Sequence, residues 1–220
     1  MSQARAPSRC ASATADVANL KTRYTDGARR GFFKVGVVLA HLGVSADMLT
    51  VFGLLLQVGL VPLVLTGHFV WAVPLGVVAG FCDALDGAVA RAGAGPTKAG
   101  AFLDSTTDRI SELLASGALV IYFARLGEWA PTVAVLVFLG AAQMVSYTRA
   151  RAEALGVECK VGLMSRPERL VLLGLGFLFS GWSIGDTSVL VWVVYLAAAL
   201  TSLTVAHRMV HVMRKLRASP

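Results

Sequence analysis

Charged residues within a long apolar sequence place the strongest constraint on how this chain can fold. From about residue 35 to residue 206 apolar residues dominate, and the mean hydropathy of +0.69 is far above that of an ordinary soluble domain. Within this stretch, residues 83–108 read DALDGAVARAGAGPTKAGAFLDSTTD and contain four aspartates. A carboxylate is costly to place in a membrane, so this segment indicates a functional site.

The length of the chain fits a single membrane domain. With 220 residues there is room for about six helices of about 20 residues each. We therefore predict an all-α integral membrane protein with six transmembrane helices. Their expected ranges are 47–66, 69–91, 99–124, 130–152, 168–182 and 187–212, separated by breaks that contain glycine or proline.

The remaining segments are more basic. We expect residues 1–15 to be a disordered basic tail, and residues 16–42 to form an interfacial amphipathic helix, because basic and apolar positions alternate there and Lys34 would lie inside a seventh span. Residues 43–213 then form the six-helix membrane domain. Residues 214–220 form a basic tail on the cytoplasmic side.

The basic residues also predict how the chain is oriented in a cell membrane. The formal net charge is +7, and nearly all lysines and arginines fall at one side of the predicted bundle, with only Arg125 at a connection on the other. The positive-inside rule then places both termini and the aspartates toward the cytoplasm of a multi-pass protein. Basic and aromatic residues are not interleaved, so we expect membrane lipids as partners and no nucleic acid.

The spacing of the aspartates predicts a metal centre. In helices, Asp83 and Asp86 would share one face, and so would Asp104 and Asp108. Carboxylates in low dielectric need a counter-charge. Without nearby histidine or cysteine they favour Mg²⁺ or Mn²⁺, and four of them can hold two ions. We predict all four aspartates as ligands of two Mg²⁺ ions, with Mn²⁺ as the alternative.

Phosphate is the usual ligand of such a pair of ions. Gly87 and Gly100 have no side chain, so a pyrophosphate can approach both helix backbones closely. Arg91, two turns after Asp83, can add a charged clamp.

The full pattern is D-x-x-D-G-x-x-A-R, eight residues, then G-x-x-x-D-x-x-x-D, with eight fixed positions over residues 83–108. It resembles the signature of the CDP-alcohol phosphotransferases. The resemblance implies a membrane enzyme that transfers a phosphatidyl-type group from a CDP-diacylglycerol-like lipid to an alcohol and releases CMP. It also implies a homodimer, and a role for Asp108 as the general base that accepts the proton of the acceptor hydroxyl.

The resemblance extends to the start of the first span. Asp47 and Thr50 are similar to a family element whose polar residues meet the nucleotide of the donor, although Asp47 or Ser45 can equally cap the helix. The donor nucleotide and pyrophosphate are therefore expected to contact a set of six residues. These are Asp47, Thr50, Gly87, Ala90, Arg91 and Gly100.

A basic cluster near the end of the fourth span predicts the acceptor site. Ser146, Arg149 and Arg151 can face the bundle together, and Arg208 of the last span can reach the same cavity. The alternative is that these arginines only mark the cytoplasmic side. Segments 98–109, 146–153 and 166–169 resemble the phosphatidylinositol-phosphate synthases, which implies inositol phosphate as the acceptor.

Other functions remain open from the sequence. Phosphatidylglycerophosphate synthesis would also explain a positively charged acceptor site, and the lipid donor can be an ester or an ether. A cation-coupled membrane transporter would place aspartates in a helical bundle too, but it needs no glycines at these fixed positions. A lipid-binding protein without activity has little reason to keep four carboxylates.

Overall fold

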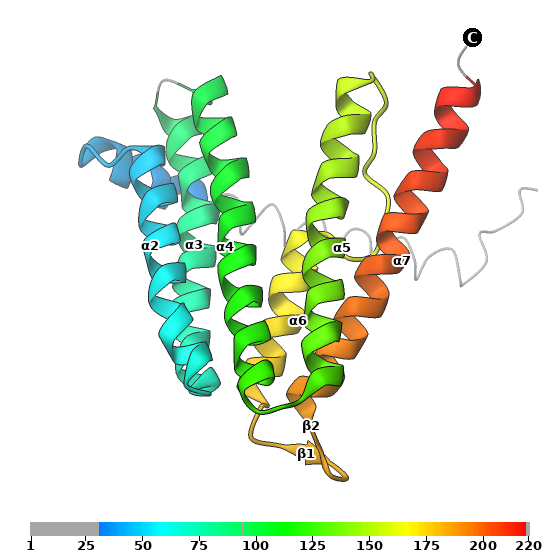
Figure 1. The fold of residues 1–220 in the computed structure, drawn as a ribbon. Coiled ribbons are helices and arrows are strands. Elements are labelled where there is room, and N and C mark those ends of the chain that lie inside the picture. The colour runs from blue at the N-terminus through cyan, green and yellow to red at the C-terminus, as the bar shows by residue number, and fades with distance from the viewer. Residues whose placement is uncertain (1–30, 94, 219–220) are drawn as a thin grey trace, which may run out of the picture.

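The structure is a helical bundle with one short hairpin (Figure 1). It is a computed structural model and describes residues 31–93 and 95–218. The predicted tail at residues 1–15 and the first half of the predicted amphipathic helix, residues 16–30, lie outside this described part. The elements are α2 (Ala46–Leu65), α3 (Phe69–Ala92), α4 (Lys98–Arg125), α5 (Trp129–Ala154), α6 (Arg166–Leu178), β1 (Ser183–Ile184), β2 (Thr187–Ser188) and α7 (Val189–Ala218).

Helices α2 to α7 occupy the six ranges predicted from the sequence. Four of them, α2, α3, α5 and α7, are long and apolar enough to cross a membrane, which agrees with a multi-pass membrane protein. Helix α4 has 28 residues but carries several charges, and α6 has only 13 residues. Helix α6 ends at Leu178 rather than near residue 182, because the chain then turns into the antiparallel β1–β2 hairpin.

Local sequence signals set the helix ends close to the site. Ser45 caps α2 by accepting a hydrogen bond from the Met48 amide, so Ser45 rather than Asp47 is the cap. Thr97 caps α4 in the same way, through the Gly100 amide at 2.9 Å. The cap leaves the Asp47 carboxylate available for other contacts.

The two halves of the bundle meet most tightly near the hairpin end. Phe69 of α3 stacks on Phe177 of α6 at 5.3 Å between ring centroids, and meets Tyr122 of α4 edge-on at 4.8 Å. Buried Leu60, Val64, Leu119 and Leu190 complete this core. Toward the opposite end, the group of α2, α3 and α4 diverges from α5 and α7 (Figure 1).

A short helix over Gly31–His41 precedes the bundle. Its closest approach is at Gly36, where an added Cβ would lie 2.8 Å from the backbone of Ala88 in α3. Phe33, Val38 and Leu42 on or just after this helix are exposed. One face thus packs on α3 while apolar side chains remain uncovered.

Candidate active site

Helices α3 and α4 bring three of the predicted metal ligands together. One carboxylate oxygen from each of Asp83, Asp104 and Asp108 lies within 4.8 Å of the other two. Helix α2 packs against both α3 and α4, which fixes the two carboxylate-bearing faces relative to each other. These three side chains are partly buried, so their negative charges are only partly solvated.

The donor set of this cluster fits a hard divalent cation. It consists of carboxylate oxygens from three helix positions, without a histidine or cysteine in the group. Oxygen ligands of this kind suit Mg²⁺ and Mn²⁺ better than Zn²⁺. Asp83, Asp104 and Asp108 would therefore hold the metal directly.

Asp86, the fourth predicted ligand, is placed slightly differently. It is buried, with 7% of its surface exposed, and accepts a 2.7 Å hydrogen bond from the hydroxyl of Thr50 in α2. The Thr50 hydroxyl also contacts the Ala46 carbonyl at 3.1 Å. Thr50 thus orients the Asp86 carboxylate, and this contact ties the start of α2 to the aspartate motif.

A cavity of about 500 Å³ lies beside the cluster, between the starts of α2 and α4 and the end of α3. Small residues form most of its wall, and we call it the polar cavity because three aspartates and three hydroxyl side chains also line it. It contains five of the six residues predicted for the donor nucleotide and pyrophosphate, together with two of the aspartates. These lining residues are Asp47, Thr50, Gly87, Ala90 and Gly100, with Asp86 and Asp104. The sixth, Arg91, lies next to this cavity, because a Cβ added to Gly87 would be 3.2 Å from its guanidinium.

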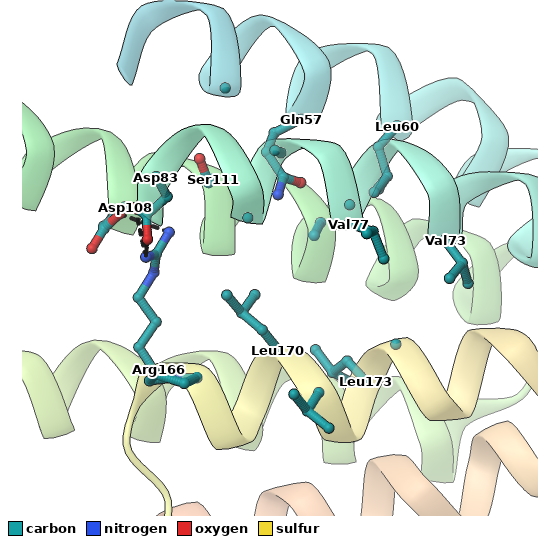
Figure 2. A pocket seen from close by; sticks show the side chains of 18 of the residues that line it. Gln57, Leu60, Val73, Val77, Asp83, Asp108, Ser111, Arg166, Leu170 and Leu173 are labelled. Atoms are coloured by element: carbon teal, nitrogen blue, oxygen red, sulfur yellow. Dashed lines mark hydrogen bonds and ion pairs between the residues drawn. The ribbon is translucent and has the colours of Figure 1, made fainter. Parts of the chain in front are cut away.

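A second, mainly apolar cavity of about 600 Å³ runs between α2, α3 and α6 (Figure 2). Asp83 and Asp108 lie at one end, and leucines and valines line the rest, among them Val73, Val77 and Leu170. Thr50 and Asp86 line both cavities. The aspartates therefore lie where a polar cavity meets an apolar one.

Arg166, at the start of α6, is the cation of the site. Its Nη1 lies 3.0 Å from both oxygens of Asp83, and its Nη2 lies 2.6 Å from Asp108 (Figure 2). Its Nε is buried and has no hydrogen-bond partner within the described residues. The sequence showed Arg166 only as part of a similar segment and did not place it in the site.

A second arginine of α6 makes a fully buried ion pair. Arg169, 1% exposed, donates from Nε and Nη2 to the two carboxylate oxygens of Glu112 in α4, at 2.7 and 3.0 Å. Its Nη1 donates to the Met164 carbonyl at 3.1 Å. This bidentate pair fixes α6 against α4 just beyond the aspartates, and so positions Arg166.

The predicted acceptor residues lie apart from the two cavities. Arg149 is exposed and pairs with Glu153 at 2.8 Å, Arg151 is exposed, and Ser146 is partly buried. Arg208 is buried and donates to the carbonyls of Val161 and Val145 at 2.8 and 2.6 Å.

An all-helical membrane bundle with a carboxylate cluster between a polar and an apolar cavity defines a metal-dependent membrane phosphotransferase for an amphipathic substrate. The profile of the CDP-alcohol phosphatidyltransferase family matches residues 43–203. The chain belongs to this family, and it is an enzyme of this class. The enzymes of the family use divalent metals, in agreement with the donor set found here.

Named relatives and solved structures agree with this assignment. The archaetidylinositol phosphate synthase of Methanothermobacter thermautotrophicus is 35% identical over 80% of this chain and 87% of its own length. The phosphatidylinositol phosphate synthase of Mycobacteroides abscessus is 38% identical over 78% of each chain. Mycobacterium tuberculosis phosphatidylinositol phosphate synthase (PgsA1), solved with CDP-DAG bound, superposes with a TM-score of 0.76 at 29% identity, over 83% of this chain and 94% of that one. A second structure of PgsA1 contains manganese and citrate.

Proposed function

We propose that this enzyme transfers the phosphatidyl group of a CDP-diacylglycerol-like lipid to inositol phosphate, giving phosphatidylinositol phosphate and CMP. The observation that carries the proposal is the position of the aspartates at the junction of a polar and an apolar cavity. An amphipathic donor fits this junction in one orientation. Its nucleotide occupies the polar cavity, its chains occupy the apolar one, and its pyrophosphate lies between them.

The site residues divide the work accordingly. Asp47 and Thr50 meet the nucleotide end, while Gly87, Ala90 and Gly100 leave room for the pyrophosphate, and Arg91 adds positive charge. Asp83, Asp86, Asp104 and Asp108 would hold two divalent ions, which would supply positive charge to the phosphate oxygens of the donor.

The reaction is a displacement at the lipid-linked phosphorus. A hydroxyl oxygen of the acceptor forms a bond to this phosphorus, and the bond from phosphorus to the bridging pyrophosphate oxygen breaks. CMP leaves with that electron pair. Asp108 accepts the proton of the attacking hydroxyl, which need only be partly removed as the new bond forms.

The acceptor phosphate is recognised by arginine. Arg149, Arg151, Arg208 and Ser146 lie on α5 and α7, beside the loop that leads to α6. Nη2 of Arg208 has no hydrogen-bond partner in the described part of the chain, because the contacts to Val161 and Val145 use Nε and Nη1. A phosphomonoester carries two negative charges, so this cluster suits inositol phosphate better than an uncharged polyol.

The membrane arrangement belongs to the same proposal. Helices α4 and α6 also cross the bilayer, which gives six spans, and the helix over Gly31–His41 lies in the interface with its exposed apolar face toward lipid. The termini and the aspartates face the cytoplasm, and two copies form a homodimer. The lysines and arginines cluster at connections on one side of the predicted bundle, and this supports the orientation.

An acceptor screen tests the proposal. Purified protein is given radiolabelled CDP-diacylglycerol and Mg²⁺ with inositol phosphate, inositol or glycerol phosphate, and labelled lipid and CMP are measured. We expect transfer to inositol phosphate. Robust transfer to glycerol phosphate with none to inositol phosphate would refute the acceptor assignment, and absence of CMP release with every acceptor would refute the donor assignment.

A further inference from the structure

One polar side chain in the apolar cavity has no role in the reaction described so far. Gln57 of α2 is 9% exposed and points into the cavity between α2, α3 and α6 (Figure 2). Its neighbours along that face of α2 are Gly53 and Leu60, and the facing wall includes Val77 and Leu170. Its carboxamide has no hydrogen-bond partner within residues 31–93 and 95–218.

The carboxamide faces the cavity and has no protein partner in this described part, so its hydrogen-bonding capacity is free for a molecule that occupies the cavity. The hydroxyl of Ser111 on α4 is in the same situation, with 8% of the residue exposed, in the same cavity and without a partner among the described residues. Two hydrogen-bond donors in an otherwise apolar part of the cavity wall indicate a ligand that has hydrogen-bond acceptor atoms between its polar and apolar parts.

The position of Gln57 along α2 defines where such an acceptor lies. Gln57 is two turns after Thr50, which is about 10 Å along the helix axis. Helical side chains lean toward the N-terminus by about one turn, so the amide reaches back toward the Thr50–Asp86 contact. A hydrogen-bond acceptor of the ligand that meets Gln57 would therefore lie close to the expected pyrophosphate position, on its apolar side. Ser111, one turn beyond Asp108, reaches a similar depth from α4.

We propose that Gln57, assisted by Ser111, binds the ester carbonyls of the lipid donor and makes the enzyme select a diacyl over a dialkyl lipid. This inference rests on the proposed function. A diacylglycerol carries its two ester carbonyls a few bonds from the phosphate, at the boundary between its polar and apolar parts. An ether lipid has no carbonyl there, so it leaves the amide unpaired, and sites built for a hydrogen bond discriminate against ligands that lack it.

The test compares two CDP-lipids with identical chains, CDP-dioleoylglycerol and its dioleyl ether analogue, by CMP release. We expect the unmodified enzyme to favour the ester in kcat/KM by about five- to tenfold, the effect of one neutral hydrogen bond. Gln57→Met, of similar size, should bring this ratio close to one. The matched control is Leu60→Met in the same cavity wall, which should keep the ratio of the unmodified enzyme. The ratio does not depend on the fraction of active protein.

A second measurement needs no turnover. The infrared band of ¹³C-labelled ester carbonyls in bound donor should lie at lower wavenumber in the unmodified enzyme than in Gln57→Met. A ratio of one in the unmodified enzyme, or an unchanged ratio in Gln57→Met, would overturn this inference alone. Absence of CMP release from both lipids would instead overturn the proposed function, and an unshifted carbonyl band would then also overturn the role of Gln57.

Discussion

Arg166 and Asp108 form the shortest ion pair of the site, with 2.6 Å between Nη2 and Oδ1. The same guanidinium contacts both oxygens of Asp83 through Nη1. Arg166 therefore neutralises two of the three carboxylates that are arranged to hold a divalent cation. The Arg166 guanidinium and a divalent cation therefore compete for the same carboxylate oxygens.

Removal of this guanidinium should change metal affinity. For Arg166→Gln we expect Mn²⁺ to bind about tenfold more tightly without substrate, which corresponds to about 1.4 kcal/mol, while turnover falls. Electron paramagnetic resonance titration of Mn²⁺ gives the affinity. The control is Arg125→Gln, in the last turn of α4 and away from the aspartates, which should bind Mn²⁺ with the affinity of the unmodified protein. Weaker binding in Arg166→Gln would show that Arg166 supports the metal site rather than competing with it.

The aspartates should be required individually. Asp83→Asn, Asp86→Asn and Asp104→Asn each remove a charge that balances divalent ions, so we expect losses of at least about 100-fold in rate, or roughly 2.7 kcal/mol. CMP release at saturating Mg²⁺ measures the effect. Asp186→Asn in the exposed β1–β2 turn is the control. Near-normal turnover in all three site variants would contradict the metal assignment.

Arg149 should act on the acceptor and not on the donor. For Arg149→Ala we expect the KM for inositol phosphate to rise about fivefold with little change in kcat, because a charged hydrogen bond to phosphate is lost. Steady-state kinetics with varied acceptor measure this change. An unchanged acceptor KM in Arg149→Ala and Arg208→Ala would remove both from the acceptor site.

The buried pair between Glu112 and Arg169 should contribute to stability in a partner-dependent way. Arg169→Leu leaves a buried carboxylate without its counter-charge, and we expect a loss of about 3–5 kcal/mol. Replacing both residues by leucine should recover much of this loss. Thermal unfolding in detergent measures the unmodified protein, Arg169→Leu and the double variant. Equal destabilisation of single and double variants would mean that the charges are not coupled.

Cysteine labelling tests the orientation in the membrane. In a chain without Cys10, Cys82 and Cys159, Lys160→Cys should react with an impermeant reagent only from the cytoplasmic side, and Ser183→Cys in the hairpin only from the other side. Both positions are exposed. The reverse pattern would overturn the proposed topology.

The sequence predicts this protein well where the signal is local. Helix ranges follow from apolar length and glycine breaks, as at Gly67 and Gly127, which adopt positive φ at the ends of α2 and α4. Five of the six residues predicted to meet the donor line one cavity, because they come from one motif and the start of α2. Arg166 was missed because its partner Asp83 is 83 residues away, and only the packing of α6 on α3 brings them together.

For the basic residues, the sequence indicates the charge but not the contact that each side chain makes. Arg208 is predicted to contact the acceptor because arginines bind phosphate, and this stays a prediction; the structure adds that two of its nitrogens donate to the carbonyls of Val145 and Val161. A charge pattern along a sequence cannot distinguish an arginine that binds a ligand from one that fixes a loop. The hairpin between α6 and α7 was expected only as a break, since two-residue strands leave no periodic signal.

The ion pairs between α6 and the first half of the bundle have a consequence for biogenesis. Ribosomes make Asp83, Asp108 and Glu112 before either arginine of α6, and Arg169 follows Glu112 by 57 residues. At ordinary rates of ribosomal synthesis this gap lasts on the order of several seconds. During that time the acidic helices have no cationic partner from α6, so they cannot settle stably in lipid by themselves. The nascent protein therefore depends on its last quarter, from α6 onward, to complete insertion, and a chain truncated before α6 should be a substrate for membrane quality-control proteases.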